Sequence, residues 1–139
     1  MSLDFGSLAM GISSLEAALR VSDSQNYSRF TEDEQKVIKA GVIQNFEFTY
    51  ELCWKYMRRW LEENIGRSYS EGIARHELFR LARENHLILD VEAWMRHHRA
   101  RNKTSHTYDP IRADEVFGDA KLFLNDAKNL LIQLEKRND

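Results

Sequence analysis

Three side chains that can take part in phosphate chemistry lie within the short stretch RNKTSHTY, residues 101–108. Arg101 carries a permanent positive charge on a planar guanidinium that suits phosphate oxygens. His106 can give or take a proton near neutral pH, and Tyr108 adds a phenol hydroxyl. Together these residue types favour a site that binds or acts on a phosphate group.

The spacing of these residues predicts a break in the helix that carries them. On a straight helix the step from Arg101 to His106 turns roughly 140°, so one continuous helix would hold the two side chains apart. Hydroxyl residues within the stretch compete for backbone hydrogen bonds, and Asp109 precedes Pro110, which disfavours the α conformation. We expect the helix to end here and a turn to carry His106 and Tyr108. The alternative is that a second protomer supplies the partner residue.

The composition predicts one soluble domain in a reducing cytoplasm. The 139 residues are 42% hydrophobic, which is enough for one core and too little for two ordinary domains, so residues 1–139 are expected to form a single domain. The one cysteine, Cys53, cannot form an internal disulfide, and its apolar helical surroundings are typical of a buried thiol. Neither a secretion signal nor an apolar run of ~20 residues is present, which predicts a cytoplasmic protein with no membrane partner.

Charge is distributed unevenly along the chain. The formal net charge of -2 argues against a general nucleic-acid coat. Between residues 96 and 112, however, one acid, Asp109, stands among five basic side chains: Arg96, Arg99, Arg101, Lys103 and Arg112. The same stretch holds His97, His98 and His106. We expect a basic patch that attracts a polyanion and gains charge at mildly acid pH; the alternative is an ordinary solvated helix face.

Apolar spacing predicts the first two helices. Between Leu8 and Leu19 apolar residues recur at steps of three and four, as in an amphipathic helix. Thr31 and Glu34 have the spacing of a capping box, and a long helix without glycine or proline from 42 to 65 is expected to follow.

The long helix has a broad apolar face. Its apolar positions are Ile38, Val42, Ile43, Phe46, Tyr50, Leu52, Cys53, Trp54, Tyr56, Met57, Trp60 and Leu61. They cover an arc of roughly 200°, which is wide for a small bundle and makes a second copy of the chain a plausible partner. The other face is charged and is expected to be solvated, with Glu51 and Lys55 at the favourable four-residue spacing.

Start and stop signals predict the remaining helices. Gly66 is expected to end the long helix, and Ser68 to Glu71 offers a second capping box for a helix running to about Asn85. The core face of that helix is predicted to be Ala74, Leu78, Leu81 and Ala82. The apolar run 87–89 is treated as a connector.

Two aspartates mark the last two helices. Asp90 is a good N-cap for the helix that delivers Arg101, and Asp109 with Pro110 starts the final one. The expected core positions of the final helix are Val116, Ala120, Phe123, Ala127, Leu130 and Leu134. No strand-like alternation persists, so the predicted fold class is all-α, an antiparallel bundle of four to five helices.

The motif and its context resemble a known superfamily. The stretch RNKTSHTY matches the R-x4-H-x-Y signature of HEPN proteins, and GVIQNFEFTYELCWK at 41–55 with Trp94 is similar to the nucleotidyltransferase substrate-binding branch. The likeness covers most of the chain. It implies a HEPN-like helical homodimer encoded beside a minimal nucleotidyltransferase. The related HepT branch includes metal-independent RNase toxins that the partner silences.

The resemblance also implies roles for individual residues. His106 would take the proton of a ribose 2′-hydroxyl, and Arg101 would stabilise the charge that builds on the phosphate. Asn102 could orient His106, and Lys103 and Arg99 could attract the RNA strand. The partner would add nucleotide to Tyr108. The other histidines, His76 and His86, have no metal-ligand spacing, so neither a metal nor another cofactor is expected.

Two classes of function remain open on these residues. In the first, the chain is an RNase toxin whose activity the nucleotidyltransferase blocks by modifying Tyr108. In the second, it is a non-catalytic subunit that presents a substrate to the nucleotidyltransferase. The sequence retains the residues for both.

Overall fold

The computed structural model describes residues 3–66 and 73–138, and these residues form α-helices and short 3-10 turns with no strand. The α-helices are α1 (Gly6–Ser22), α2 (Glu32–Asn64), α4 (Arg75–Glu84), α5 (Val91–Asn102) and α6 (Pro110–Lys136). The turns are η1 (Tyr27–Arg29) and η2 (Thr104–His106). The predicted fold class, an all-α bundle of four to five helices, is confirmed.

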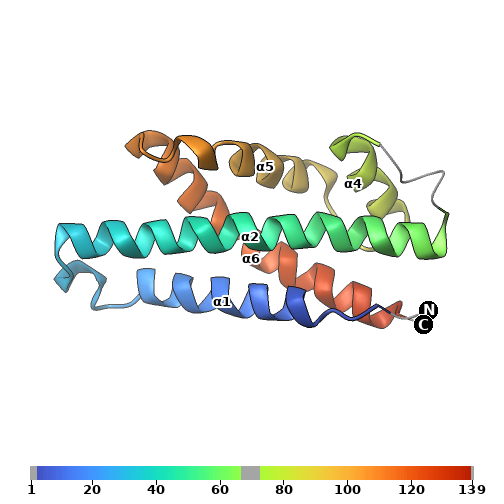
Figure 1. Cartoon of the computed structure of the whole chain (residues 1–139), viewed down its shortest axis with the longest axis horizontal. Coiled ribbons are helices and arrows are strands. Elements are labelled where there is room, and N and C mark those ends of the chain that lie inside the picture. Colours follow the sequence, from blue (N-terminus) through green and yellow to red (C-terminus); the bar gives the residue numbers. More distant parts are fainter. Residues whose placement is uncertain (1–2, 67–72, 139) are drawn as a thin grey trace.

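The helix α2 runs the length of the molecule, and each of the other four α-helices in the described ranges contacts it (Figure 1). α1 lies antiparallel along one side of α2, and α4 and α5 lie on the opposite side. α6 crosses α2 obliquely and also contacts α1 and α5, so it closes the core from the remaining direction. The bundle therefore holds the end of α5, which carries the motif, between α2 and the start of α6.

The ends of α2 follow the predicted signals. The Thr31 side chain accepts a hydrogen bond from the Glu34 backbone N–H at 3.1 Å, and the Thr31 N–H donates to Oε1 of Glu34 at 2.8 Å, which completes the capping box. Gly66 has φ 128° and its N–H donates to the Leu61 carbonyl at 3.1 Å. A left-handed residue after the last turn ends a helix in this way, and glycine adopts that conformation without strain.

The caps of the last two helices are also confirmed. Oδ1 of Asp90 accepts from the Ala93 N–H at 3.1 Å, and Oδ1 of Asp109 accepts from the Ile111 N–H at 3.0 Å, with Pro110 in the first helical turn. The predicted capping box at 68–71 lies outside the described residues.

The helix α4 corrects one predicted core position. Ala74 precedes the helix as its N-cap and is exposed, because a residue in extended conformation does not share the face of the helix that follows. Leu78 and Ala82 are buried as predicted, Leu81 is partly buried, and Phe79 is fully buried. After α4, Leu87 and Ile88 are buried in the connector.

The core matches the predicted apolar faces closely. All six predicted positions of α6 are buried, as is the Cys53 thiol, whose pKa burial raises. On α2 the partly exposed members of the predicted face are Ile38, Leu52 and Trp54. Within the ranges that the structure describes, no helix is long and apolar enough to cross a membrane.

His97 is an unexpected polar member of the core. Its ring is 1% exposed and lies between two carboxylates of α6, with Nδ1 2.7 Å from Asp119 Oδ2 and Nε2 2.6 Å from Asp126 Oδ2. Trp94 and Phe123 pack edge-on against the same ring. The prediction that His97 contributes to a basic surface patch is therefore wrong: the residue joins α5 to α6 inside the bundle.

The two carboxylates favour the charged form of His97. Burial opposes the charge, but the hydrogen bonds and negative charges of Asp119 and Asp126 outweigh it and raise the pKa above the ordinary value of 6.5. A group whose pKa is higher in the folded state stabilises the fold fully below its unfolded pKa. That contribution is lost as pH rises above 6.5 and through the higher folded pKa.

We predict that His97→Leu lowers the free energy of unfolding by about 3 kcal/mol at pH 6, because two partly buried carboxylates lose their shared cation. The difference from wild type should shrink as pH rises, measured by urea denaturation between pH 5.5 and 9. The matched control is His76→Leu, since His76 lies in an exposed pair 3.9 Å from Glu92 and should matter little. A His97→Leu penalty that does not change with pH would contradict a charged His97.

Candidate functional site

The motif spans the end of α5 and a short turn before α6. α5 ends at Asn102, and Thr104–His106 form the 3-10 turn η2, so the predicted break in the helix is confirmed. His106 and Tyr108 are both exposed, Tyr108 at 84%, and their rings meet edge-on with centroids 6.1 Å apart. The Thr107 hydroxyl donates to the Thr104 carbonyl at 3.3 Å and supports this turn.

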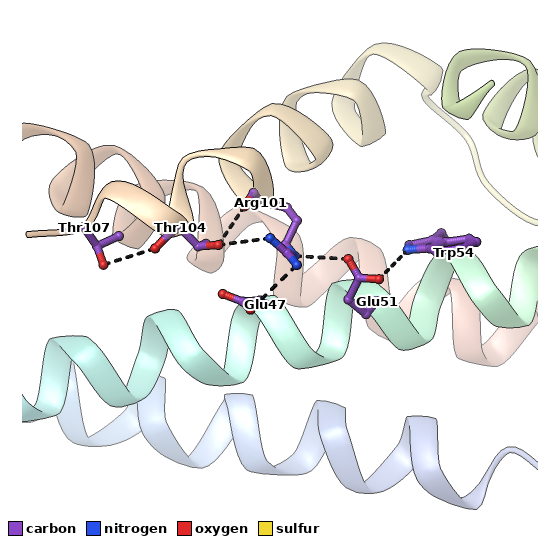
Figure 2. A network of polar contacts seen from close by, with 6 residues as sticks. All are labelled: Glu47, Glu51, Trp54, Arg101, Thr104 and Thr107. Atoms are coloured by element: carbon purple, nitrogen blue, oxygen red, sulfur yellow. Dashed lines mark hydrogen bonds and ion pairs between the residues drawn. The ribbon is translucent and has the colours of Figure 1, made fainter.

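Arg101 is held at the boundary between α5 and the turn (Figure 2). Its Nε donates to Glu51 Oε1 at 3.1 Å and its Nη1 donates to the Thr104 hydroxyl at 3.2 Å. Nη2 lies 3.7 Å from Glu47 Oε1. The other oxygen of Glu51 accepts from Trp54 Nε1 at 3.0 Å, so α2 fixes the carboxylate that fixes Arg101.

This network corrects part of the prediction of a solvated charged face on α2: Lys55 and Arg58 are exposed as expected, but Glu47 and Glu51 are partly covered. Glu51 faces Arg101 rather than Lys55, and its side chain is 31% exposed because α5 packs over this part of α2. The Lys55 ammonium instead lies 5.8 Å from the centre of the Trp54 ring. The favourable sequence spacing of Glu51 and Lys55 was outweighed by a tertiary partner 50 residues away.

The two central residues of the motif do not meet within one chain. Among the described residues, Arg101 and His106 share neither a hydrogen bond nor an ion pair. Arg101 points toward α2, whereas His106 is exposed on the turn. Asn102 is exposed at the last residue of α5, and no hydrogen bond to His106 occurs in the described part of the chain.

The predicted basic patch is partly neutralised. Lys103 pairs with Glu115 of α6, and Arg101 pairs with the two glutamates of α2. Arg96 and Arg99 are exposed and line a groove with Lys103 whose volume is about 460 Å³. Carboxylates from α2 and α6, which are distant in sequence, therefore offset part of the positive charge of this surface.

His98 is also held by a contact with a neighbouring helix. Its Nδ1 lies 2.8 Å from the Tyr50 hydroxyl. Burial, followed by the charge of Arg75, lowers the pKa of His98, so the ring is less readily protonated than an ordinary histidine. Of the three histidines predicted to charge the patch at mildly acid pH, only His106 is exposed.

Arg75 is a neighbour of this site that sequence reasoning missed. Its guanidinium lies 3.6 Å from the centre of the Trp54 ring, a cation–π contact, and burial lowers its pKa. Through Trp54 it adjoins the carboxylate of Glu51 that holds Arg101. No local motif marks Arg75, because the contact depends on how α4 packs against α2.

Comparison with known proteins identifies the family. The family model described as "Nucleotidyltransferase substrate binding protein like" matches residues 3–136. The chain belongs to this family. A curated relative from Haemophilus influenzae, named probable ribonuclease HepT, is 34% identical over 124 residues, covering 88% of this chain and 85% of the relative.

Solved structures of similar proteins share the fold. A Haemophilus influenzae protein, described as revealing the fold of a substrate-binding domain of a nucleotidyltransferase, superposes with a TM-score of 0.88 at 33% identity over 95% of this chain and 99% of that one. A Thermus thermophilus protein gives a TM-score of 0.73 at 26% identity over 91% and 98%. The resemblance to nucleotidyltransferase substrate-binding proteins is confirmed.

We predict that Glu51→Ala destabilises the protein by about 1–2 kcal/mol, because it leaves a half-buried guanidinium and the Trp54 indole N–H without their main acceptor. Urea denaturation measures the change. The matched control is Glu63→Ala, an exposed glutamate of the same helix, which should cost about 0.5 kcal/mol or less. Equal effects of the two variants would mean that the Arg101 network does not contribute to stability.

Proposed function

We propose that the protein is the partner of a minimal nucleotidyltransferase in a two-gene, toxin–antitoxin-like module, and that Arg101 and His106 form a metal-independent endoribonuclease site. One observation carries the proposal: a fixed cation, Arg101, stands at the end of α5 immediately before an exposed turn that presents His106 and Tyr108. Family membership and the name of the HepT relative support it.

The proposed reaction uses the ribose of RNA as the nucleophile. His106 takes the proton of a 2′-hydroxyl, and the 2′-oxygen bonds to the adjacent phosphorus. The bond from phosphorus to the 5′-oxygen breaks, that oxygen takes a proton from water, and a 2′,3′-cyclic phosphate remains. Arg101 stabilises the negative charge that builds on the phosphate oxygens.

The surrounding residues have supporting roles in this proposal. Arg99 and Lys103 line one groove at the end of α5 and would bind the RNA backbone. Asn102, exposed at the end of α5, would orient His106 once RNA is bound. Lys103 is already paired with Glu115, so an RNA phosphate would have to replace that carboxylate.

The complete site is proposed to form in a homodimer. Arg101 points toward α2 while His106 faces solvent, so a second chain can bring its own His106 to this Arg101. Large apolar side chains on the outer surface of α2 support a partner chain, since Val37 is 71% and Phe48 58% exposed. In this arrangement each active site contains residues of both protomers.

We predict that the purified protein cleaves RNA in the presence of EDTA and leaves 2′,3′-cyclic phosphate ends, because His106 performs the proton transfer. Arg101→Ala and His106→Ala should each lower the rate by at least about 100-fold. Gel analysis of a labelled RNA measures cleavage, and circular dichroism checks that helicity is kept. Loss of cleavage in EDTA that magnesium restores would overturn the mechanism.

Mixing the two inactive variants tests the shared site. A dimer of one Arg101→Ala chain and one His106→Ala chain retains one intact Arg101–His106 combination if the site spans both chains, so about a quarter of wild-type activity is expected after subunit exchange. The control is each variant refolded alone. No recovery in a mixture that contains the mixed dimer would place each site within one chain.

A non-catalytic role is the second candidate, and one observation favours it. Arg101 is already paired with Glu51 and Glu47, and among the described residues it shares neither a hydrogen bond nor an ion pair with His106. In this case the chain presents a substrate to the nucleotidyltransferase, as the family description indicates. Absence of RNase activity together with tight binding to the nucleotidyltransferase would favour this function.

Tyr108 is proposed as the nucleotide acceptor in the catalytic case. Its phenol oxygen attacks the α-phosphorus of ATP, the bond to pyrophosphate breaks, and the phenol proton passes to a base of the nucleotidyltransferase. The exposure of Tyr108 at 84% supports access by a second enzyme. The phosphodiester adds negative charge and bulk near His106, which would compete with RNA for the same cations.

We predict that incubation with the cognate nucleotidyltransferase, ATP and magnesium adds one or more AMP units to wild type and none to Tyr108→Phe. Intact mass spectrometry measures the adduct. The control is Tyr56→Phe, which removes a buried phenol hydroxyl that donates to the Asp4 carbonyl, and it should leave the adduct unchanged. Equal adducts on Tyr108→Phe and wild type would exclude Tyr108 as the acceptor.

A further inference from the structure

Tyr108 lines a groove whose other residues have no role in the chemistry described above. The groove has a volume of about 420 Å³ and lies between α2, the turn after η2 and the start of α6. Its lining residues are Lys36, Lys39, Ala40, Ile43, Thr107, Tyr108, Pro110, Ala113 and Asp114. The residues come from three segments of the chain, so the groove exists only in the folded bundle.

Two lysines on one face of α2 give the groove its positive charge. Lys36 and Lys39 are three residues apart and therefore neighbours on the helix surface. Lys36 is 71% exposed and lies 3.7 Å from Glu32, while Lys39 is 32% exposed and pairs with Asp114 at 2.5 Å. Both pairs are accessible to water, so a ligand anion can replace either carboxylate at small cost.

The rest of the groove lining is largely apolar and includes an aromatic ring. Ile43 and Ala113 line the groove and are buried, and Pro110 lines it and is exposed. Tyr108 presents a ring on which a planar base can stack, and Thr107 adds a hydroxyl to the lining. A groove lined by two cations together with apolar and aromatic side chains suits a small ligand with a phosphate and a flat ring.

We propose that this groove is a nucleotide subsite, in which Lys36 and Lys39 hold the phosphate of a nucleoside monophosphate and its base lies against Tyr108 and the apolar lining. The volume is within the usual range of small-molecule sites. The biological role of this subsite rests on the proposed function, because it would bind a nucleotide that has been joined to Tyr108. The groove would then retain the modified turn in one position.

The test is isothermal titration calorimetry of the full chain with AMP, adenosine and inorganic phosphate. AMP should bind at least about tenfold more tightly than adenosine or inorganic phosphate, because only AMP has both a phosphate for the lysines and a base for the apolar and aromatic lining. Lys36→Gln and Lys39→Gln should each weaken AMP binding about three- to tenfold and leave adenosine binding unchanged. Asp114→Asn should tighten AMP binding, because it frees Lys39 from its present partner.

A distant ion pair gives controls with the same changes of charge. Lys128 of α6 pairs with Glu16 of α1 and lines no part of the groove. Lys128→Gln and Glu16→Gln should leave the AMP affinity at the wild-type value. The proposal is overturned if wild type fails to bind AMP, if inorganic phosphate binds as tightly as AMP, or if the lysine variants match their controls.

These outcomes separate the subsite from the proposed function. Lysine-dependent AMP binding by a protein that neither cleaves RNA nor accepts nucleotide on Tyr108 supports the subsite and contradicts the proposed function. RNA cleavage and Tyr108 modification without AMP binding support the proposed function and contradict the subsite.

Discussion

The ion pair between Arg101 and Glu51 is the contact on which the geometry of the motif depends. It joins the last turn of α5 to the middle of α2, and the two side chains are 28% and 31% exposed. Partial burial makes such a pair stronger than a surface pair, provided that the remaining donors and acceptors are satisfied. Here Trp54 occupies the second oxygen of Glu51, and Thr104 accepts from Arg101. The guanidinium consequently has a fixed position where the helix gives way to the turn.

That arrangement has an electrostatic consequence for any phosphate ligand. Glu47 and Glu51 together carry two negative charges against the single positive charge of Arg101. A phosphate approaching Arg101 therefore meets a locally acidic surface unless other cations take part. Lys103 can contribute only if the phosphate replaces Glu115 as its partner. In the proposed ribonuclease mechanism, the binding of RNA at this surface would therefore depend strongly on salt and on cations beyond the motif.

The sequence predicts the fold better than it predicts the site. Capping boxes and apolar spacing are local signals, so the ends of α2 and the buried positions of α6 followed from residues within a few turns of each other. The partners of charged side chains are not local. Arg101 is 50 residues from Glu51, and Lys39 is 75 residues from Asp114. Spacing alone assigned Glu51 to Lys55 and left the groove beside Tyr108 unseen.

His97 and His98 illustrate why composition could not give the charge of the patch. They are adjacent and chemically identical, but one residue of helix turns the side chain by about 100°. That rotation directs His97 to Asp119 and Asp126 of α6 and His98 to the Tyr50 hydroxyl of α2. Paired carboxylates raise the pKa of the first ring, whereas burial and neighbouring arginines lower that of the second. α5 is thereby bound to both neighbouring helices about one turn before Arg101, so the contacts that bury His97 and partly bury His98 also hold the helix that carries the motif arginine.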